Sequence, residues 1–132
     1  MLLEAMIAIL IFSIGILAVI ALQAAAVSAS SDAKYRSDAA MLANELVSQM
    51  RAGNRTPGVL QLNFQAGGAN YNVWVNRVQA ALPMVSAKLP TVVINPVNLS
   101  SSVATITIFW KLPSQAGQAN SEHQYSTIVQ II

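Results

Sequence analysis

An apolar run at the start of the chain constrains its fold more than any other feature. Residues 1–29 contain a single charged side chain, Glu4, and no proline, and residues 5–30 contain no ionisable side chain. A helix of roughly 23 such residues is about 35 Å long, enough to cross a hydrocarbon layer of about 30 Å with some tilt. Burial in a globular core is the alternative, but 132 residues could hardly cover so long a rod on every side. The run therefore predicts a membrane-spanning helix.

A secretory signal peptide is a second alternative for this run, and its features fit poorly. Such a signal has a basic first region, a shorter apolar run and a cleavage site of small residues. Here the apolar run starts at the first residue and continues into further helical pattern. The first basic residues, Lys34 and Arg36, follow the run. The positive-inside rule then places the C-terminus in the cytoplasm, unless a basic leader has been removed from the chain.

Residues 30–52 continue the helical pattern and become one-sided. Gly53 directly after this stretch is a natural helix stop, and Pro57 forbids much continuation. Apolar side chains recur at spacings of three and four and form one stripe: Tyr35, Ala39, Leu42, Ala43, Leu46, Val47 and Met50. The sequence therefore predicts one helix over residues 2–52, apolar all round in its first half and amphipathic in its second.

Two residues of the apolar half are candidate functional residues. A carboxylate such as Glu4 is costly near the start of a membrane helix and suggests a function by default. Its alternative role is a helix-end charge that reaches the lipid headgroups and suits the helix N-terminus. Gly15 lowers helix propensity in water, but small residues let membrane helices approach closely. It is also a point where the helix can loosen.

The next part of the chain is a connection followed by a short helix. Residues 53–72 are rich in Gly and Asn, with turn signals at Thr56-Pro57-Gly58 and Gly67-Gly68. Within this connection, residues 59–64 alternate weakly and suggest a short strand. Residues 72–83 have apolar side chains near helical spacing and predict a helix with Asn72 as its N-cap.

Three strands are predicted in the remainder. They cover residues 91–97, 102–110 and 124–132, with a polar loop over residues 112–123 between the last two. In the middle strand Ile106 and Ile108 face the same side as Ala104 and Trp110. Connections of these lengths predict an antiparallel meander, which needs an apolar partner on one face. The stripe of the long helix can supply that partner, so Tyr35, Leu42, Leu46, Met50, Ile106 and Ile108 are the candidate core.

Composition excludes several classes of function. The net charge is only +2 and the seven basic residues form no cluster, so we expect no nucleic-acid partner. The chain has no cysteine, and its one histidine, His123, is expected as half of a solvent-exposed pair with Glu122. No catalytic triad, phosphate-binding glycine loop or cluster of metal ligands is present in the sequence. We therefore predict no enzyme, no cofactor, no metal and no catalytic residue.

The run LLEAMIAILIFSIGILAVIALQ resembles the N-terminus of a mature type IV pilin. That family reads Phe-Thr-Leu-Ile/Leu-Glu followed by about twenty apolar residues, after a short basic leader ending in Gly. Leu2, Leu3 and Glu4 match the end of this motif, and residues 5–22 match its apolar continuation. Three residues precede Glu4 where the family has four, and the leader and its Gly are absent, so the N-methylated first residue has no counterpart here.

The rest of the chain is similar to PilV-type minor pilins, over parts of residues 42–132. The matching segments are LANELVSQMRA, ATITIFW followed by Lys, and QYSTIVQI. A minor pseudopilin of a type II secretion system shares the Leu-Leu-Glu start and a small head, and remains an alternative. A membrane-anchored binding or enzyme module is a third.

The resemblance implies a fold, a location and partners. The fold is α+β and pilin-like, a long N-terminal helix packed against a small antiparallel sheet, with residues 1–29 as membrane or filament-core segment and residues 30–132 as head. The protein would be a structural minor pilin, single-pass in the inner membrane with its head outside the cytoplasm, and then part of an extracellular type IV pilus used in adhesion and twitching motility. In the filament Glu4 would pair with the N-terminal amine of an adjacent subunit. In a tip or priming complex that initiates assembly, it would instead seat the neighbouring subunits. Expected partners are major and minor pilins, a tip adhesin, and the prepilin peptidase during maturation.

Overall fold

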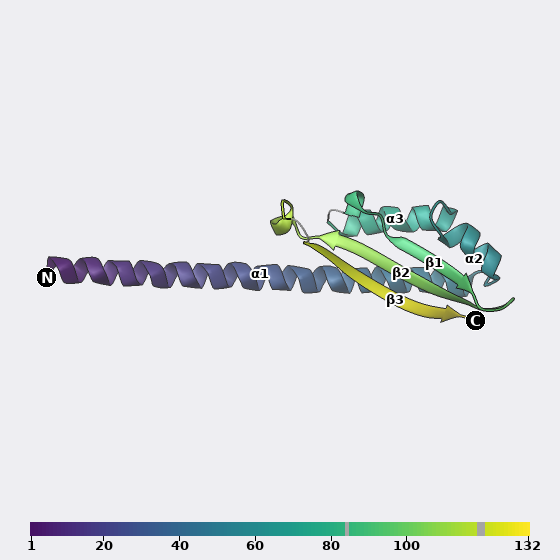
Figure 1. Ribbon diagram of the computed structural model, residues 1–132, viewed down its shortest axis with the longest axis horizontal. Coiled ribbons are helices and arrows are strands. Elements are labelled where there is room, and N and C mark those ends of the chain that lie inside the picture. Colours follow the sequence, from purple (N-terminus) through teal and green to yellow (C-terminus); the bar gives the residue numbers. More distant parts are fainter. Residues whose placement is uncertain (84, 119–120) are drawn as a thin grey trace. The chain divides into compact units, whose positions relative to one another are not determined.

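The computed structural model describes residues 1–83, 85–118 and 121–132, so residues 119–120 of the predicted polar loop lie outside the described part. The chain forms two compact units, Met1–Ala33 and Lys34–Ile132. Figure 1 shows the elements in order: α1 (Leu2–Ala52), α2 (Pro57–Phe64), α3 (Ala69–Ala81), β1 (Thr91–Pro96), β2 (Ser102–Lys111) and β3 (Glu122–Ile131). Short 3-10 turns cover Val85–Ala87 and Pro113–Gln115. The fold is α+β, with the pilin-like layout of a long N-terminal helix and a small antiparallel sheet.

Helix α1 runs from Leu2 to Ala52 without a break, as its sequence predicts. Ala, Leu, Ile and Met favour the helix, and proline is absent until residue 57. At its C-terminal end the N–H of Gly53 donates to the carbonyl oxygen of Gln49 at 3.2 Å. The chain then turns away at Asn54, whose side-chain oxygen accepts from the Thr56 N–H.

The sheet is an antiparallel meander in the order β1-β2-β3, with β2 at its centre (Figure 1). Val92 lies opposite Ile106 in the first pair of strands, and Ala104 lies opposite Val129 in the second. Burial alternates along the strands because successive side chains point to opposite faces. The inner face of β2 carries Ser102, Ala104, Ile106, Ile108 and Trp110, all buried.

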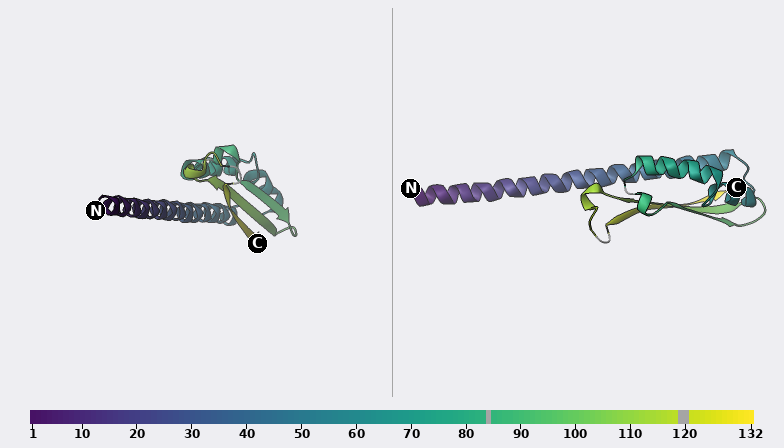
Figure 2. Two further views of the ribbon diagram at one scale, coloured as in Figure 1. Left: turned by 60° about the vertical axis from the view of Figure 1, so that its left-hand side comes forward. Right: turned by 90° about the horizontal axis from the view of Figure 1, so that it is seen from above.

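The core lies between the inner face of the sheet and a layer of helices. Figure 2 shows α3 and the 34–52 part of α1 on one side of the sheet. The core contains buried side chains of α1, α2, α3 and all three strands, among them Leu46, Leu60, Trp74, Ile94, Ile106 and Ile131. The one-sided half of α1 therefore supplies the apolar partner that the meander requires.

Helix α2 corrects the prediction of a strand over residues 59–64. Pro57 occupies the first turn of the helix, where its missing N–H costs nothing. The buried residues of this helix are Pro57, Leu60 and Phe64, and they follow helical spacing. The prediction of a strand depended only on the weak alternation of apolar and polar residues. The side chains of Gln61 and Gln65 then both donate to the carbonyl oxygen of Ile94, at 2.9 and 3.3 Å, and tie α2 to β1.

The predicted helix over residues 72–83 exists but begins three residues earlier, at Ala69. Asn72 is therefore not the N-cap, which is Gly68. Asn72 instead lies in the first turn, where its N–H donates to the Gly68 carbonyl oxygen at 3.0 Å. The helix ends before Pro83, whose carbonyl oxygen accepts from the backbone N–H of Lys111.

Candidate functional site

The apolar half of α1 is the most unusual surface of the chain. Residues 1–27 are all exposed, and most carry large apolar side chains. Phe12 is 69% exposed and Leu22 is 71% exposed. Within the described residues, α1 is the one helix that is long and apolar enough to cross a membrane. Soluble surfaces rarely expose so continuous an apolar area, so this segment requires lipid or other protein around it.

Two serine hydroxyls of α1 are bonded in a way that suits an apolar surrounding. Ser13 donates its hydroxyl to the carbonyl oxygen of Ile9 at 2.7 Å, one turn earlier in the helix. Ser31 does the same to Val27 at 2.9 Å. Hydroxyls bonded in this way leave no polar group unsatisfied when the helix is surrounded by lipid or by other helices.

Glu4 lies in the first turn of α1 with its side chain exposed. The helix begins around it, because the N–H of Ala5 donates to the carbonyl oxygen of Met1 at 3.1 Å. A carboxylate in this turn interacts favourably with the partial positive charge of the helix N-terminus. It is also the only charged side chain before Asp32, so it introduces one negative charge at the end of an otherwise apolar rod.

Gly15 lies in a shallow hollow on the same surface. The side chains around it are Phe12, Ile16, Val19, Ile20 and Gln23. A Cβ atom added at Gly15 would meet nothing within 4 Å in the chain itself. The hollow can therefore receive a side chain of another helix, which is how small residues act in membrane helix contacts.

The remaining candidate residues lie in the Lys34–Ile132 unit and form its core. Leu46, Met50, Ile106 and Ile108 have no exposed surface, and Leu42 is 5% exposed. Tyr35 is partly buried and packs against the same cluster. These residues stabilise the head and leave Glu4 and Gly15 as the candidates for contact with other molecules.

Helix α3 is joined to α1 by polar contacts that the periodicity did not indicate. Trp74 Nε1 donates to the carbonyl oxygen of Leu42 at 2.9 Å, and Arg77 forms an ion pair with Glu45. One turn earlier in α3, Tyr71 donates its hydroxyl to the carbonyl oxygen of Pro90 at 2.6 Å. Burial raises the pKa of the Tyr71 phenol, because the charged form would lose its hydration.

His123 differs from its predicted place in an exposed loop. It belongs to β3, lies opposite Trp110 in the sheet, and stacks on that indole with ring centroids 5.9 Å apart. Its Nε2 lies 3.1 Å from Gln115 Oε1. Glu122 is instead paired with Lys88 at 2.6 Å. His123 therefore packs against an aromatic side chain, and no group of three potential metal ligands occurs among the described residues.

No model of a known protein family, no curated protein and no solved structure matches this chain. The features that bear on its function are therefore the long helix, the position of Glu4 and the core that the second half of α1 completes.

Proposed function

We propose that this chain is a structural minor pilin, a subunit that inserts in the inner membrane and then joins a type IV pilus. One observation carries the proposal: the two halves of α1 have different surroundings. The first half exposes apolar side chains along its whole length, and the second half buries Leu46 and Met50 in the head. A subunit with this design can leave the lipid for a filament core without unfolding its head, because the buried core of the head begins only at Ala39.

Glu4 supports the proposal through its position. When many such helices bundle, their N-termini lie among apolar side chains, and each α-amino group needs a counter-charge. The carboxylate of Glu4 in the first turn of a neighbouring helix can provide it. Such a pair also sets the axial register between adjacent subunits, because it forms at one relative height only. Gly15 would provide a notch for close approach of the helices.

The same design implies a location and partners. Before assembly the apolar half lies in the inner membrane and the head lies outside the cytoplasm. The partners are major and minor pilins, the prepilin peptidase during maturation, and a tip adhesin where the subunit takes part in a tip or priming complex. The role is structural, with no chemical reaction assigned to it.

The experiment measures incorporation of variants into pili. Cells would express the protein with Glu4→Leu, Glu4→Gln or Glu4→Asp, and the amount in sheared pili would be divided by the amount in membranes. Removing one partner of a buried charge pair costs roughly 3–5 kcal/mol, so Glu4→Leu and Glu4→Gln should insert normally and assemble poorly. Glu4→Asp keeps the charge and should recover part of the assembly.

One result would overturn the role of Glu4, and another would overturn the pilin proposal itself. Normal incorporation of Glu4→Leu would leave Glu4 as a helix-end charge without a role in assembly. Mass spectrometry of the protein from its native host should also find a processed and methylated N-terminus, whereas a generic membrane anchor would show neither modification.

A further inference from the structure

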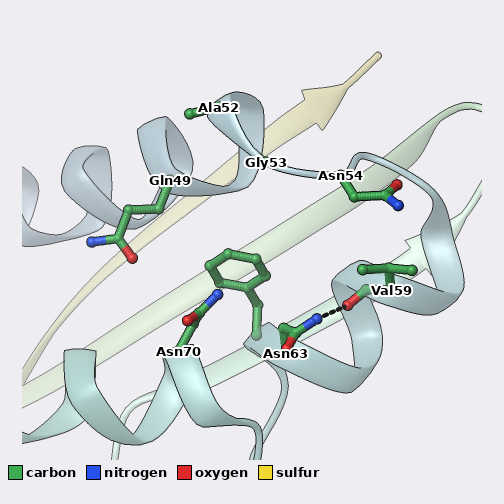
Figure 3. Close-up of a pocket in the computed structure, with 8 residues that line it drawn as sticks. Gln49, Ala52, Gly53, Asn54, Val59, Asn63 and Asn70 are labelled. Carbon is green, nitrogen blue, oxygen red and sulfur yellow. Dashed lines mark hydrogen bonds between the residues drawn. The ribbon is translucent and has the colours of Figure 1, made fainter.

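A pocket of about 510 Å³ opens in the Lys34–Ile132 unit, where α1, α2, α3 and the α1–α2 connection meet. Figure 3 shows side-chain amides around it from all four segments. They belong to Gln49 of α1, Asn54 of the connection, Asn63 of α2 and Asn70 of α3. Phe64 and Val59 add an apolar lining, and the Phe64 side chain is otherwise buried. The pocket thus combines four neutral polar groups with an apolar wall.

A double-glycine turn between α2 and α3 builds this pocket. Gly67 has φ +90°, a conformation that favours glycine. A Cβ atom on Gly68 would lie 2.3 Å from the carbonyl oxygen of Asn63, so only glycine allows this approach of the two helices. The turn places the first residues of α3, including Asn70, beside the last turns of α2.

Hydrogen bonds within the unit orient three of the amides. Asn63 Nδ2 donates to a backbone carbonyl of its own helix at 2.9 Å, so Asn63 Oδ1 is left as an acceptor. The oxygen of Asn54 accepts from a backbone N–H two residues later at 3.0 Å, so its NH₂ group is left as a donor. Gln49 Nε2 donates to a carboxylate one turn earlier at 3.2 Å, so its oxygen is left as an acceptor. The side chain of Asn70 is exposed, and its amide can both donate and accept a hydrogen bond.

The character of the ligand follows from these groups. None of the eight lining residues has an ionisable side chain, so a charged ligand would lose hydration without gaining a counter-charge. Donors and acceptors that line the same hollow match hydroxyl groups, each of which donates and accepts. The apolar lining suits the C–H face of a sugar ring. An extended peptide would need a row of backbone partners along an edge, whereas these amides come from four separate segments.

We propose that the amide pocket of Gln49, Asn54, Asn63 and Asn70 binds a neutral saccharide, free or as the end of a glycan chain. This inference does not depend on assembly into a filament, because all of its residues belong to the head. Pockets of this volume commonly accept small molecules with a few convergent polar groups.

The test uses the full chain in phosphocholine micelles, since detergents with sugar headgroups would compete for the pocket. The protein, labelled with ¹⁵N, is titrated with glucose, galactose, mannose, N-acetylglucosamine and N-acetylgalactosamine, and the side-chain amide signals are followed by NMR. Glucuronic acid and triglycine serve as the charged and peptide probes. A parallel measurement on surfaces coated with the matching glycans distinguishes a free sugar from a chain end.

At least one neutral sugar should shift the amide signals of the pocket. Asn70→Ala removes two hydrogen-bonding groups and should weaken that binding about tenfold. Asn76→Ala is the matched control, because Asn76 is an exposed asparagine of the same helix that does not line the pocket. It should leave the affinity unchanged. Preference for glucuronic acid or triglycine, an equal loss in both variants, or no response to any neutral sugar or glycan surface would overturn the proposal.

Discussion

The indole Nε1 of Trp74 donates a hydrogen bond to the backbone carbonyl oxygen of Leu42 at 2.9 Å, with both side chains buried. The bond joins α3 to α1 across 32 residues of sequence. Apolar packing alone permits sliding between helices, whereas a directional bond in a dry core allows one register. The ion pair between Arg77 and Glu45 lies about one helical turn further along α3 and α1, and it supports the same register.

Removal of residues 1–27 should leave a soluble, folded head. Every one of these residues is exposed, and the first core residue of α1 is Ala39. A fragment of residues 28–132 should therefore show a single cooperative transition in urea, followed by far-ultraviolet circular dichroism. A fragment without a cooperative transition would mean that the head needs the apolar half in order to fold.

Trp74→Phe should destabilise that fragment more than Trp110→Phe. The two changes remove similar volume from buried sites, but only Trp74 has a hydrogen-bond partner for its indole N–H among the described residues. The difference in unfolding free energy should be about 1 kcal/mol, the net value of one buried hydrogen bond. Urea melts of both variants measure it, and a difference of zero or opposite sign would contradict the role given to the Trp74 bond.

Leu46→Ala should cost about 2–5 kcal/mol, because it leaves a cavity beneath the sheet. Leu46 has no exposed surface. Met41→Ala on the same helix is the control, since Met41 is 64% exposed. That variant should stay within about 0.5 kcal/mol of the parent. Similar losses for both in urea melts would show that the buried face of α1 has been assigned wrongly.

The Tyr71 phenol should make the head less stable at high pH. Burial raises its pKa above the ordinary value of 10.0, so the folded state holds the proton more tightly than the unfolded state. Its stabilising effect is complete below pH 10.0 and is lost as the pH rises through the folded pKa. Tyr71→Phe removes this group and its bond to Pro90. The difference in unfolding free energy between parent and Tyr71→Phe should therefore shrink between neutral pH and about pH 11.

Gly15→Leu should lower incorporation into pili several-fold and leave the head unchanged. The added side chain fills the hollow next to Phe12 and Ile16, and it contacts nothing in the chain itself. Ala21→Leu adds a similar side chain outside the hollow and is the control. Pilus-to-membrane ratios of the two variants measure the effect. Equal ratios would mean that the hollow is not a site of helix contact.

Most of the fold could be predicted because local pattern and tertiary packing agree. The change from all-round to one-sided hydrophobicity predicted α1 to within a residue, and the alternation of Ile106 and Ile108 predicted the inner face of β2. The strand predicted over residues 59–64 was wrong because its apolar residues also fit helical spacing, and burial of Leu60 and Phe64 against the core decides between them. His123 was misplaced because the start of β3 depends on pairing with Trp110, which no local pattern shows.

The sequence by itself determined the long helix, its exposed apolar half and the places of Glu4 and Gly15 on it, because helical periodicity alone assigns residues to a face. Only the tertiary structure decided which side chains are neighbours in the head. The amide pocket joins Gln49 and Asn70, 21 positions apart, and the Asn and Gln content of that stretch is its only trace in the sequence. Such contacts depend on how whole elements pack, here on the Trp74–Leu42 bond and on the approach that Gly68 allows.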